Sequence, residues 1–474
     1  MSIETPDAPV AVSTDQSTAS SEAARRLQEQ CGEIVVLPGD PDYDAVRTPW
    51  NVVAQQRPAA VAVPRDVAEV QAVVRAAVAA GLRIAPQGTG HGAAALAQRD
   101  LHDVVLLRTT AMTAVTVDAE RRVARAEAGA VAEQVVDAAA AHGLACLHGS
   151  SPDVGVAGLA LGGGIGWYGR KHGLASNRLE AIELVTADGE LVRADADHHP
   201  DLFWALRGGS GNFGVVTALE VRLLEIADAY AGVMMWDIAD FEKVLRHFNA
   251  WAPTAPDEVS TSLRAMRFPP LPFIPEEIRG KSLVLLDGAV LAGDARAEEI
   301  LAGFRALEPF MDTWQRVPAP SLIRLHQDPE GPTPAVGNGL LLDRLDEETL
   351  RSFVAAVGPD SETHLLMVEL RQLGGALRRE PEGAGALASL DADYAGYFVG
   401  IAPTPEIAAA GEADVERVLA SVAGAAAAQR YLNFVEKPVD TSVGYTADAW
   451  ERLRRVRAGV DPQSVFVANH AFGS

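Results

Sequence analysis

The sequence predicts an α+β protein made of two units, and three observations support this. Residues 57–85 follow a strand–helix–strand pattern, and glycine-rich runs recur from there to about residue 225. Near Ile226 these runs thin out, and longer strands and helices alternate up to about residue 424. A chain of 474 residues, 48% hydrophobic and 22% charged, is long enough for two or three globular domains.

The composition excludes several classes of protein. A net charge of −24 argues against nucleic-acid binding, which depends on Lys and Arg neutralising phosphates. Cys31 and Cys146 are the only cysteines, so neither a disulfide framework nor a cysteine metal site is expected, and no metal site is predicted. No apolar run is long enough to span a membrane. Residues 1–22 lack the basic and apolar parts of a secretory signal, so we expect a disordered tail and a cytoplasmic location.

The first unit opens with a β-α-β pattern. Residues 61–63 are predicted to form a strand that Pro64 ends, and Asp66 is a candidate helix cap. Valines at positions 67, 70, 74 and 78 then recur at helical spacing up to Gly81. Residues 82–85 form the next strand, which leads directly into a glycine loop.

Further elements follow in order. Strands are predicted at 104–107, 123–126, 180–186, 190–194 and 215–223, and helices at 131–142 and 202–206. Ala187-Asp188-Gly189 is a hairpin turn signal between two of these strands. The second unit is predicted to hold strands at 282–286, 364–370 and 397–401, with helices at 297–307, 346–356 and 412–423. A last helix is expected near 446–456, before a final segment at 461–472.

The loop 86–92, Pro-Gln-Gly-Thr-Gly-His-Gly, is the most informative segment. Glycines at this density let the backbone adopt positive φ and approach a ligand closely. Successive free N–H groups in such a loop can form an anion-binding concavity, and His91 lies where a bound cofactor would touch it. A tight turn without a ligand is the alternative interpretation.

Two segments, 164–169 and 209–214, match the Gly-x-Gly-x-x-Gly pattern. A dinucleotide-binding site of this type needs a strand before the pattern, a helix after it and an acidic residue about 20 residues later. A hairpin follows the first match and a strand follows the second, so both lie in the wrong context. The run 148–164 is a better candidate, because its small residues would let the backbone wrap a planar ligand with a diphosphate. A glycine-rich Ω-loop is the alternative.

Taken in order, these motifs resemble those of a known family. They are Gly-x-Gly-His at 88–91, Pro-x-Val-Gly through Leu-Gly-Gly-Gly-x-Gly at 152–166, Trp-Ala-Leu-Arg-Gly-Gly-x-Gly-Asn-Phe-Gly at 204–214 and Tyr-x-Asn-Phe at 431–434. The chain resembles FAD-linked oxidases of the vanillyl-alcohol oxidase superfamily, berberine-bridge-enzyme-like branch, over nearly its whole length. The resemblance implies that residues 23–225 and 430–474 jointly bind FAD, with a core of the PCMH type at 57–225. Residues 226–429 would form a substrate domain, an antiparallel sheet flanked by helices that covers the flavin.

The resemblance also implies the residues that contact FAD. His91 would carry an 8α covalent bond to the flavin, consistent with imidazole being a nucleophile; a His91 that only hydrogen-bonds a noncovalent FAD is the alternative. The other implied contacts are Gln87, Gly88, Thr89, Gly90, Gly92, Ser150, Ser151, Asp153, Val154, Gly155, Gly158, Leu161, Gly163, Gly166, Gly214, Val216 and Asn469.

The chain departs from the family pattern at three places. Many members have a cysteine where this chain has Ser151, so the flavin is expected to be attached once, not twice. Members often have Tyr-x-Asn-Tyr with the last Tyr as catalytic base, whereas this chain has Phe434 there. A His-Arg pair of the substrate sheet is replaced near Ala392-Asp393. The identity of the catalytic base is therefore open.

Four side chains are candidates for catalysis. Glu369 and Arg371 are two apart on a predicted strand and share one face, so both could face the flavin; a mutual surface ion pair is the alternative. Tyr397 could line the pocket or belong to the core. Tyr431 lies three residues before Phe434, and in an extended segment it would point to the opposite face. Glu369 is the first candidate for the base.

The sequence therefore predicts an FAD-dependent oxidase. It would remove a hydride from a C–H next to O or N of a small secondary metabolite, alcohol, sugar or amine, and reduce O₂ to hydrogen peroxide. The expected partners are this substrate and O₂, without nucleic acid or membrane; the oligomeric state is not predicted. The alternatives are a dehydrogenase that uses another electron acceptor, and a noncatalytic ligand carrier with the same fold.

Overall fold

The computed structural model describes residues 14–272 and 274–472. Of the tail predicted at 1–22, residues 1–13 lie outside this range, whereas residues 14–22 belong to helix α1 (Thr14–Cys31), which corrects the predicted boundary. Packing stabilises this helix, because Ala23, Ala24 and Leu27 are buried against the apolar side of helix α3 (Val67–Ala80). None of the helices within the described ranges is long and apolar enough to cross a membrane.

The predicted β-α-β unit forms a four-stranded sheet with the order β1-β2-β4-β3. Its strands are β1 (Val35–Val36), β2 (Ala60–Ala62), β3 (Arg83–Gln87) and β4 (Val104–Arg108), and β2, β4 and β3 run parallel. Asp66 caps α3 by accepting from the N–H of Glu69, and Gly81, with φ +76°, ends it. Helices α2 (Tyr43–Arg47) and α4 (Ala94–Ala97) are short. The loop that contains His91 follows directly after strand β3.

A second sheet is antiparallel and has the order β5-β6-β9-β7-β8. Its strands are β5 (Val115–Asp118), β6 (Val123–Glu127), β7 (Leu179–Val185), β8 (Leu191–Asp195) and β9 (Val215–Arg222). The predicted hairpin is confirmed, because β7 pairs with β8 across the turn at Gly189. The helices of this region are α5 (Ala132–Ala140), α6 (Val156–Leu161), α7 (Gly169–His172) and α8 (Pro200–Leu206).

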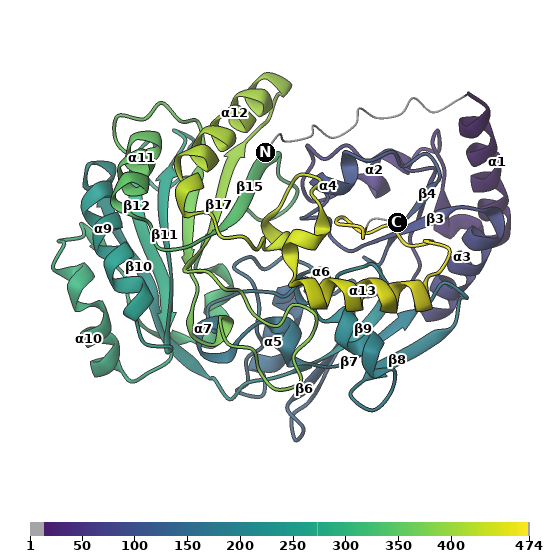
Figure 1. Ribbon diagram of the computed structural model, residues 1–474, viewed down its shortest axis with the longest axis horizontal. Helices are drawn as coiled ribbons and strands as arrows, with labels where there is room; N and C mark the ends of the chain where they lie inside the picture. Colours follow the sequence, from purple (N-terminus) through teal and green to yellow (C-terminus); the bar gives the residue numbers. More distant parts are fainter. Residues whose placement is uncertain (1–13, 273, 473–474) are drawn as a thin grey trace.

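The large sheet is antiparallel and has the order β13-β10-β12-β11-β16-β17-β15, with β14 also paired to β10. Its strands are β10 (Asp228–Asp237), β11 (Val259–Arg267), β12 (Ser282–Val290), β13 (Met311–Asp312), β14 (Gln315–Pro318), β15 (Ala335–Leu342), β16 (Met367–Gln372) and β17 (Tyr394–Ile401). Helices α9 (Phe241–Trp251), α10 (Asp294–Arg305), α11 (Glu347–Val357) and α12 (Pro405–Ser421) cover its outer face (Figure 1). The implied antiparallel sheet flanked by helices is confirmed.

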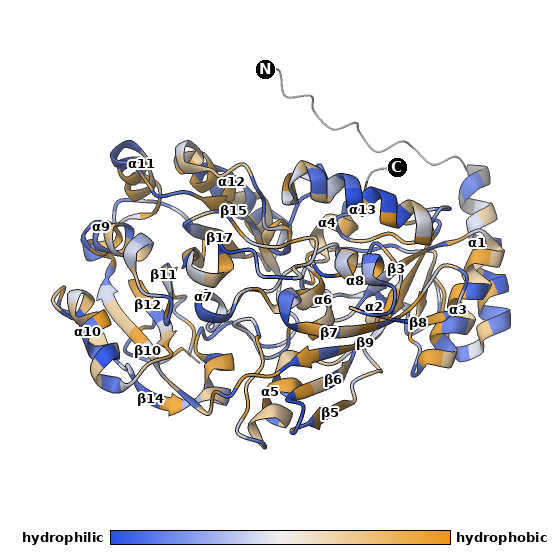
Figure 2. Cartoon of the chain, turned by 60° about the horizontal axis from the view of Figure 1, so that its bottom comes forward, coloured by the Kyte–Doolittle hydropathy of each residue, from blue (hydrophilic) through white to orange (hydrophobic). Residues whose placement is uncertain are grey.

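The two faces of the large sheet differ in chemistry. Residues of α9, α10, α11 and α12 pack with alternate strand residues, such as Leu263, Leu286 and Leu370, into one apolar cluster. The strand neighbours that point the other way include Arg264, Asp287 and other polar groups, all buried. The outward surfaces of α11 and α13 (Ala447–Val460) are hydrophilic (Figure 2). The inner face of the sheet thus carries a buried polar group beside an apolar cluster that includes Met235 and Leu285, and a core alone does not require such a polar group.

The C-terminal segment returns to the four-stranded sheet. After α13, the N–H of Val467 donates to the carbonyl of Ile84 at 2.8 Å. The buried Arg457 guanidinium donates to the backbone oxygens of Asn212 and Phe466. Residues 461–472 therefore lie beside β3, next to the glycine loop (Figure 1).

Candidate functional site

The loop after β3 holds His91 between an aromatic ring and a hydroxyl. Gly90 has φ +84°, a conformation that favours glycine, and a Cβ there would meet Pro49. The imidazole stacks on Trp50 with ring centroids 4.1 Å apart, and its Nδ1 lies 3.0 Å from Thr89 Oγ1. The ring is half-buried and its position is fixed by these contacts.

Asp153 joins this loop to two other segments. Its Oδ2 accepts from Trp50 Nε1 and from the N–H of Gly331, both at 2.7 Å. Its Oδ1 accepts from Ser151 Oγ at 2.9 Å and lies 3.2 Å from His91 Nε2. Burial alone would raise the pKa of this carboxyl, but the donors around it, His91 first, lower the pKa well below its ordinary value. Asp153 is therefore an anion that holds the predicted cofactor segments together.

Two adjacent loops present backbone donors without partners. Within the described ranges, no hydrogen bond involves the N–H groups of residues 88–92, nor those of 150, 151 and 153–155. The loops touch, because a Cβ on Gly155 would lie 3.5 Å from Thr89 Oγ1. Backbone N–H groups that are left unpaired beside each other form an anion site, so these residues fit the diphosphate of FAD.

The predicted glycines divide into two kinds. A Cβ on Gly158 would face open space, and a Cβ on Gly88 would make only ordinary contacts, the nearest at 3.8 Å. A Cβ on Gly163, Gly166 or Gly214 would instead overlap protein atoms. The first kind leaves room for a ligand, whereas the second kind lets neighbouring segments of the chain pack closely.

The remaining cofactor candidates lie around these loops. Asn469 Nδ2 comes within 3.4 Å of a Cβ built on Gly92. Val154 is half-buried beside Asp153, and Val216 is buried on β9. Leu161 is buried at the end of α6. Gln87 is also buried, but its amide is fully engaged with that of Gln56 through two reciprocal hydrogen bonds, so its side chain shapes the loop.

Glu369 and Arg371 form the predicted pair on β16, but the pair is buried, not at the surface. Arg371 Nε donates to Glu369 Oε1 at 2.7 Å, and Ser262 Oγ on β11 donates to the same oxygen. His326 Nε2 lies 3.7 Å away. Burial raises the pKa of Glu369, but the charges of Arg371 and His326 outweigh it and lower the pKa overall. A carboxylate held ionised in this way is a weak base.

A second buried ion pair supports the first. Arg264 Nη2 donates to Asp287 Oδ2 at 2.8 Å, and His326 Nδ1 lies 2.6 Å from the same oxygen. The Arg264 and Asp287 side chains are 3% and 0% exposed. His326 thus connects the Asp287 pair to Glu369. No sequence pattern pointed to His326, because it lies in a loop far from both strands in the chain.

Arg371 also bridges the large sheet and the cofactor loops. Its Nη2 donates to Ser150 Oγ at 3.4 Å, and Ser150 Oγ donates to Asp328 at 2.8 Å. Its guanidinium carbon lies 5.7 Å from the ring centre of Trp167 and 5.6 Å from that of Phe434. The inner face of the sheet and the loops with free N–H groups therefore enclose the same site.

Tyr397 lies beside Phe434 and contacts a carboxyl that the sequence did not single out. The two rings stack with centroids 4.7 Å apart, and Tyr397 OH donates to Glu436 Oε1 at 3.0 Å. Burial raises the pKa of Glu436 to about 7, although the hydrogen bond from Tyr397 opposes this. Glu436 could have been found from the sequence because it lies two residues after Phe434, at the end of the Tyr-x-Asn-Phe motif.

The orientation expected for Tyr431 is corrected. Residues Leu432–Phe434 form a 3₁₀ helix, η8, not an extended segment, so residues three apart share a face. The rings of Tyr431 and Phe434 therefore meet edge to face at 5.2 Å. The Tyr431 hydroxyl is buried, accepts from the N–H of Gly164 and receives a second bond from Asn433 Nδ2, both at 3.1 Å. Its role is to anchor the glycine run.

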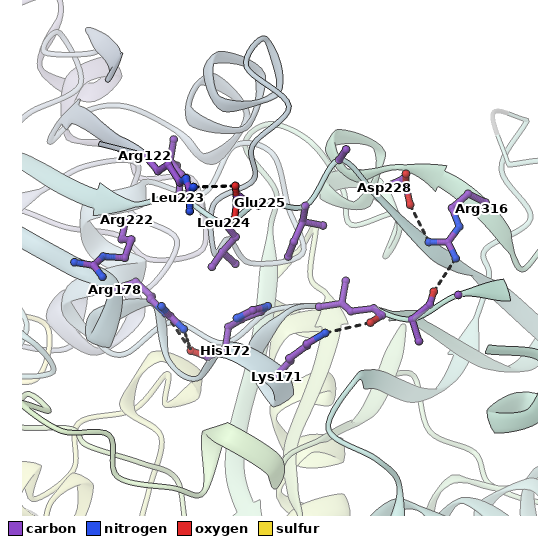
Figure 3. A pocket seen from close by; sticks show the side chains of 15 residues that line it. Arg122, Lys171, His172, Arg178, Arg222, Leu223, Leu224, Glu225, Asp228 and Arg316 are labelled. Carbon is purple, nitrogen blue, oxygen red and sulfur yellow. Dashed lines mark hydrogen bonds and ion pairs between the residues drawn. The ribbon is translucent and has the colours of Figure 1, made fainter. Parts of the chain in front are cut away.

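A cleft of about 700 Å³ lies elsewhere, between the second sheet and the large sheet (Figure 3). Several cations line it, but Arg122 pairs with Glu225, and Arg316 pairs with Asp228. No residue predicted to contact FAD or substrate lines this cleft. Among the residues that the structure describes, no group of three or more metal-ligating side chains is placed to hold a metal ion.

Comparisons with known proteins agree with this geometry. Residues 58–195 match the FAD binding domain family. The chain is 37% identical over 235 residues to (R)-6-hydroxynicotine oxidase of Paenarthrobacter nicotinovorans, covering 50% of this chain and 47% of that protein. It is 35% identical over 214 residues to xylooligosaccharide oxidase of Thermothelomyces thermophilus, covering 44% and 43%. These alignments span about half the length of each relative.

The fold is similar to that of a solved structure, Physcomitrella patens BBE-like 1. The TM-score is 0.81 at 22% identity, over 95% of this chain and 99% of that one. The structural match covers nearly the whole chain, including the large sheet.

Proposed function

We propose that this chain, which has a berberine-bridge-enzyme-like fold, is an FAD-linked oxidase that acts on a small amine or alcohol. Bound FAD would supply the two-electron oxidant for a C–H bond next to N or O, and O₂ would reoxidise it to give hydrogen peroxide. The protein's part is to bind and orient the substrate and to accept a proton from it.

One observation carries this proposal. Arg371 joins the polar inner face of the large sheet to Ser150, in a loop whose free N–H groups suit the diphosphate of FAD. A substrate held on that face would lie against the flavin. A ligand carrier would not need buried ion pairs and a raised carboxyl pKa at this place, since such groups cost stability and are typical of reactive sites.

The relatives and the lining side chains guide the choice of substrate. One relative is named for 6-hydroxynicotine and another for xylooligosaccharides. In this chain the rings of Trp167 and Phe434 lie beside Arg371, and Tyr397 stacks on Phe434, which suits a compact molecule with a flat apolar part. A small cyclic amine or alcohol therefore fits better than a long sugar chain.

The proposal includes a covalent bond between His91 and FAD. His91 lies in the loop with free N–H groups, and Ser151 cannot form a thioether, so one attachment is expected. Acid precipitation of the purified protein should leave yellow flavin in the pellet, and His91→Ala should release it. Ser151→Ala is the matched control and should keep the pellet yellow. Flavin found entirely in the wild-type supernatant contradicts the covalent bond.

The activity is tested with a panel of substrates. The protein should show a flavin spectrum that bleaches without air on adding (R)-6-hydroxynicotine, other small cyclic amines or alcohols, but less with xylooligosaccharides. In air the same substrate should give hydrogen peroxide. Bleaching without peroxide, together with reduction of an added dye, would indicate a dehydrogenase. A protein without flavin colour would indicate a carrier.

A further inference from the structure

We propose that Tyr397 and Glu436 form a proton relay that takes the O–H or N–H proton of the substrate. The relay rests on the proposed function, because it serves removal of a hydride from the neighbouring carbon. It replaces the phenol that many members of the family have at the position of Phe434.

The geometry places the two groups in series. Tyr397 lies on β17 opposite Glu369 of β16, on the inner face of the large sheet, and is half-buried. Its hydroxyl donates to Glu436 Oε1 at 3.0 Å, and Glu436 is only 9% exposed. The phenol is thus the end that a substrate can reach, and the carboxyl is the protected end behind it. The stack of Tyr397 on Phe434 fixes the ring.

Among the residues that the structure describes, no cation forms an ion pair with Glu436. Its Oε2 makes no hydrogen bond within the part of the chain that the structure describes. The neighbouring Lys437 pairs instead with Glu416 on α12. The charges that act on Tyr397 are those of Glu436, Asp328 and Glu369, all acidic. By contrast, Glu369 is paired with Arg371, and this ion pair lowers its affinity for a proton.

The titration behaviour agrees with this arrangement. Burial raises the pKa of Glu436 to about 7, so a large share of this carboxyl is ionised near neutral pH. Burial and the acidic neighbours raise the pKa of Tyr397 well above its ordinary value, so the phenol stays protonated and passes a proton on. A base whose pKa lies close to the working pH is the most effective one.

The step is balanced in atoms and electrons. The substrate, written H–C–X–H with X being O or N, loses its C–H electron pair and hydrogen as hydride to the oxidised flavin. The X–H proton moves to the Tyr397 oxygen while the Tyr397 proton moves to Glu436 Oε1. A C=X double bond forms in the product, and the protonated carboxyl later returns its proton to water.

The first test is flavin reduction without air, with the panel member that bleaches the wild-type flavin. The wild-type rate should rise with pH with an apparent pKa near 7. Glu436→Gln and Tyr397→Phe should each lower the rate about 100-fold or more and remove that pKa. Glu436→Asp should recover part of the rate and the pH dependence. Glu416→Gln, the same charge change on an exposed neighbour of Lys437, is the matched control and should behave as wild type.

The second test needs no turnover. An infrared difference spectrum of the oxidised holoenzyme between low and high pH should contain the carbonyl stretch of a protonated carboxyl that titrates near 7. Glu436→Gln should lose this band, and Glu416→Gln should keep it. A wild-type protein without the band overturns the relay.

The outcomes separate the relay from the proposed function. If the wild-type flavin is reduced but Glu436→Gln matches it in rate and pH profile, only the relay is wrong. If the flavin is present and no amine or alcohol reduces it, the proposed function fails and the relay fails with it.

Discussion

Glu436 should make this protein less stable as the pH rises, and Glu436→Gln should remove that effect. A carboxyl whose pKa is raised on folding binds its proton more tightly in the folded state than in the unfolded state. Its contribution is fully present below the unfolded pKa, near 4.5, and is lost as the pH rises through about 7. The neutral glutamine cannot titrate, so it lacks this loss.

The magnitude follows from the two pKa values. The difference between 4.5 and about 7 corresponds to about 3 kcal/mol at about 1.4 kcal/mol per pH unit. About 2 kcal/mol of this falls between pH 5.5 and pH 8.5, a range in which this acidic chain stays negatively charged. A protein of 474 residues loses about 1 kcal/mol of stability per degree near its Tm, so the effect on Tm is about 2 °C.

Thermal unfolding at pH 5.5 and 8.5 measures this effect. The Tm of Glu436→Gln minus that of the wild type should be about 2 °C larger at the higher pH. Taking this difference cancels the other groups that titrate in both proteins. Glu416→Gln, which removes an exposed carboxyl, should show no such change. If the Tm of Glu436→Gln minus that of the wild type is the same at both pH values, or smaller at pH 8.5, the pKa of Glu436 is not raised on folding.

Three further predictions follow from the site. The family resemblance implies that Val154 lies near the flavin position that meets O₂, so Val154→Leu should slow reoxidation of the reduced flavin by air, measured by stopped flow. Arg264→Met should lower Tm by about 3–5 °C, because it leaves the Asp287 carboxylate buried without its cation, at a cost of about 3–5 kcal/mol. Gly166→Ala should lower Tm and flavin content because its Cβ would overlap a backbone oxygen, whereas Gly158→Ala, facing open space, should change Tm little.

The sequence predicted helix ends and tight turns correctly, because these features depend on a few neighbouring residues. Asp66 and Gly81 marked the ends of α3, and the Asp-Gly turn marked the hairpin of β7 and β8, because caps and turns depend on a few adjacent residues. Strands β10, β11 and β15 escaped prediction. In strand β11, Ser262 and Arg264 are buried on the inner face, where they bond Glu369 of β16 and Asp287 of β12. Polar residues in a strand usually indicate a solvent-facing side, so their burial depends on tertiary contacts that the sequence pattern does not show.

The site was predicted where it depends on spacing and missed where it depends on tertiary contacts. Strand periodicity indicated that Glu369 and Arg371 share a face, and they do. Periodicity could not show that the pair is buried, nor that His326 comes from a distant loop to join it. The proton affinity of Glu436 arises from burial beside Tyr397, which only the folded chain determines.

If the relay took over from a lost phenol, returning the phenol should partly restore activity. Phe434 stacks on Tyr397 and lies under the Arg371 guanidinium at 5.6 Å, and a nearby cation favours the phenolate form of a tyrosine. The double variant Tyr397→Phe/Phe434→Tyr should therefore reduce its flavin without air about tenfold faster, or more, than Tyr397→Phe alone. One positioned base contributes about 10²–10⁴ to a rate. Phe434→Tyr alone serves as the control and should change the rate little, because the relay is intact. Without recovery in the double variant, position 434 does not face the substrate, and proton removal depends on Tyr397 and Glu436 alone.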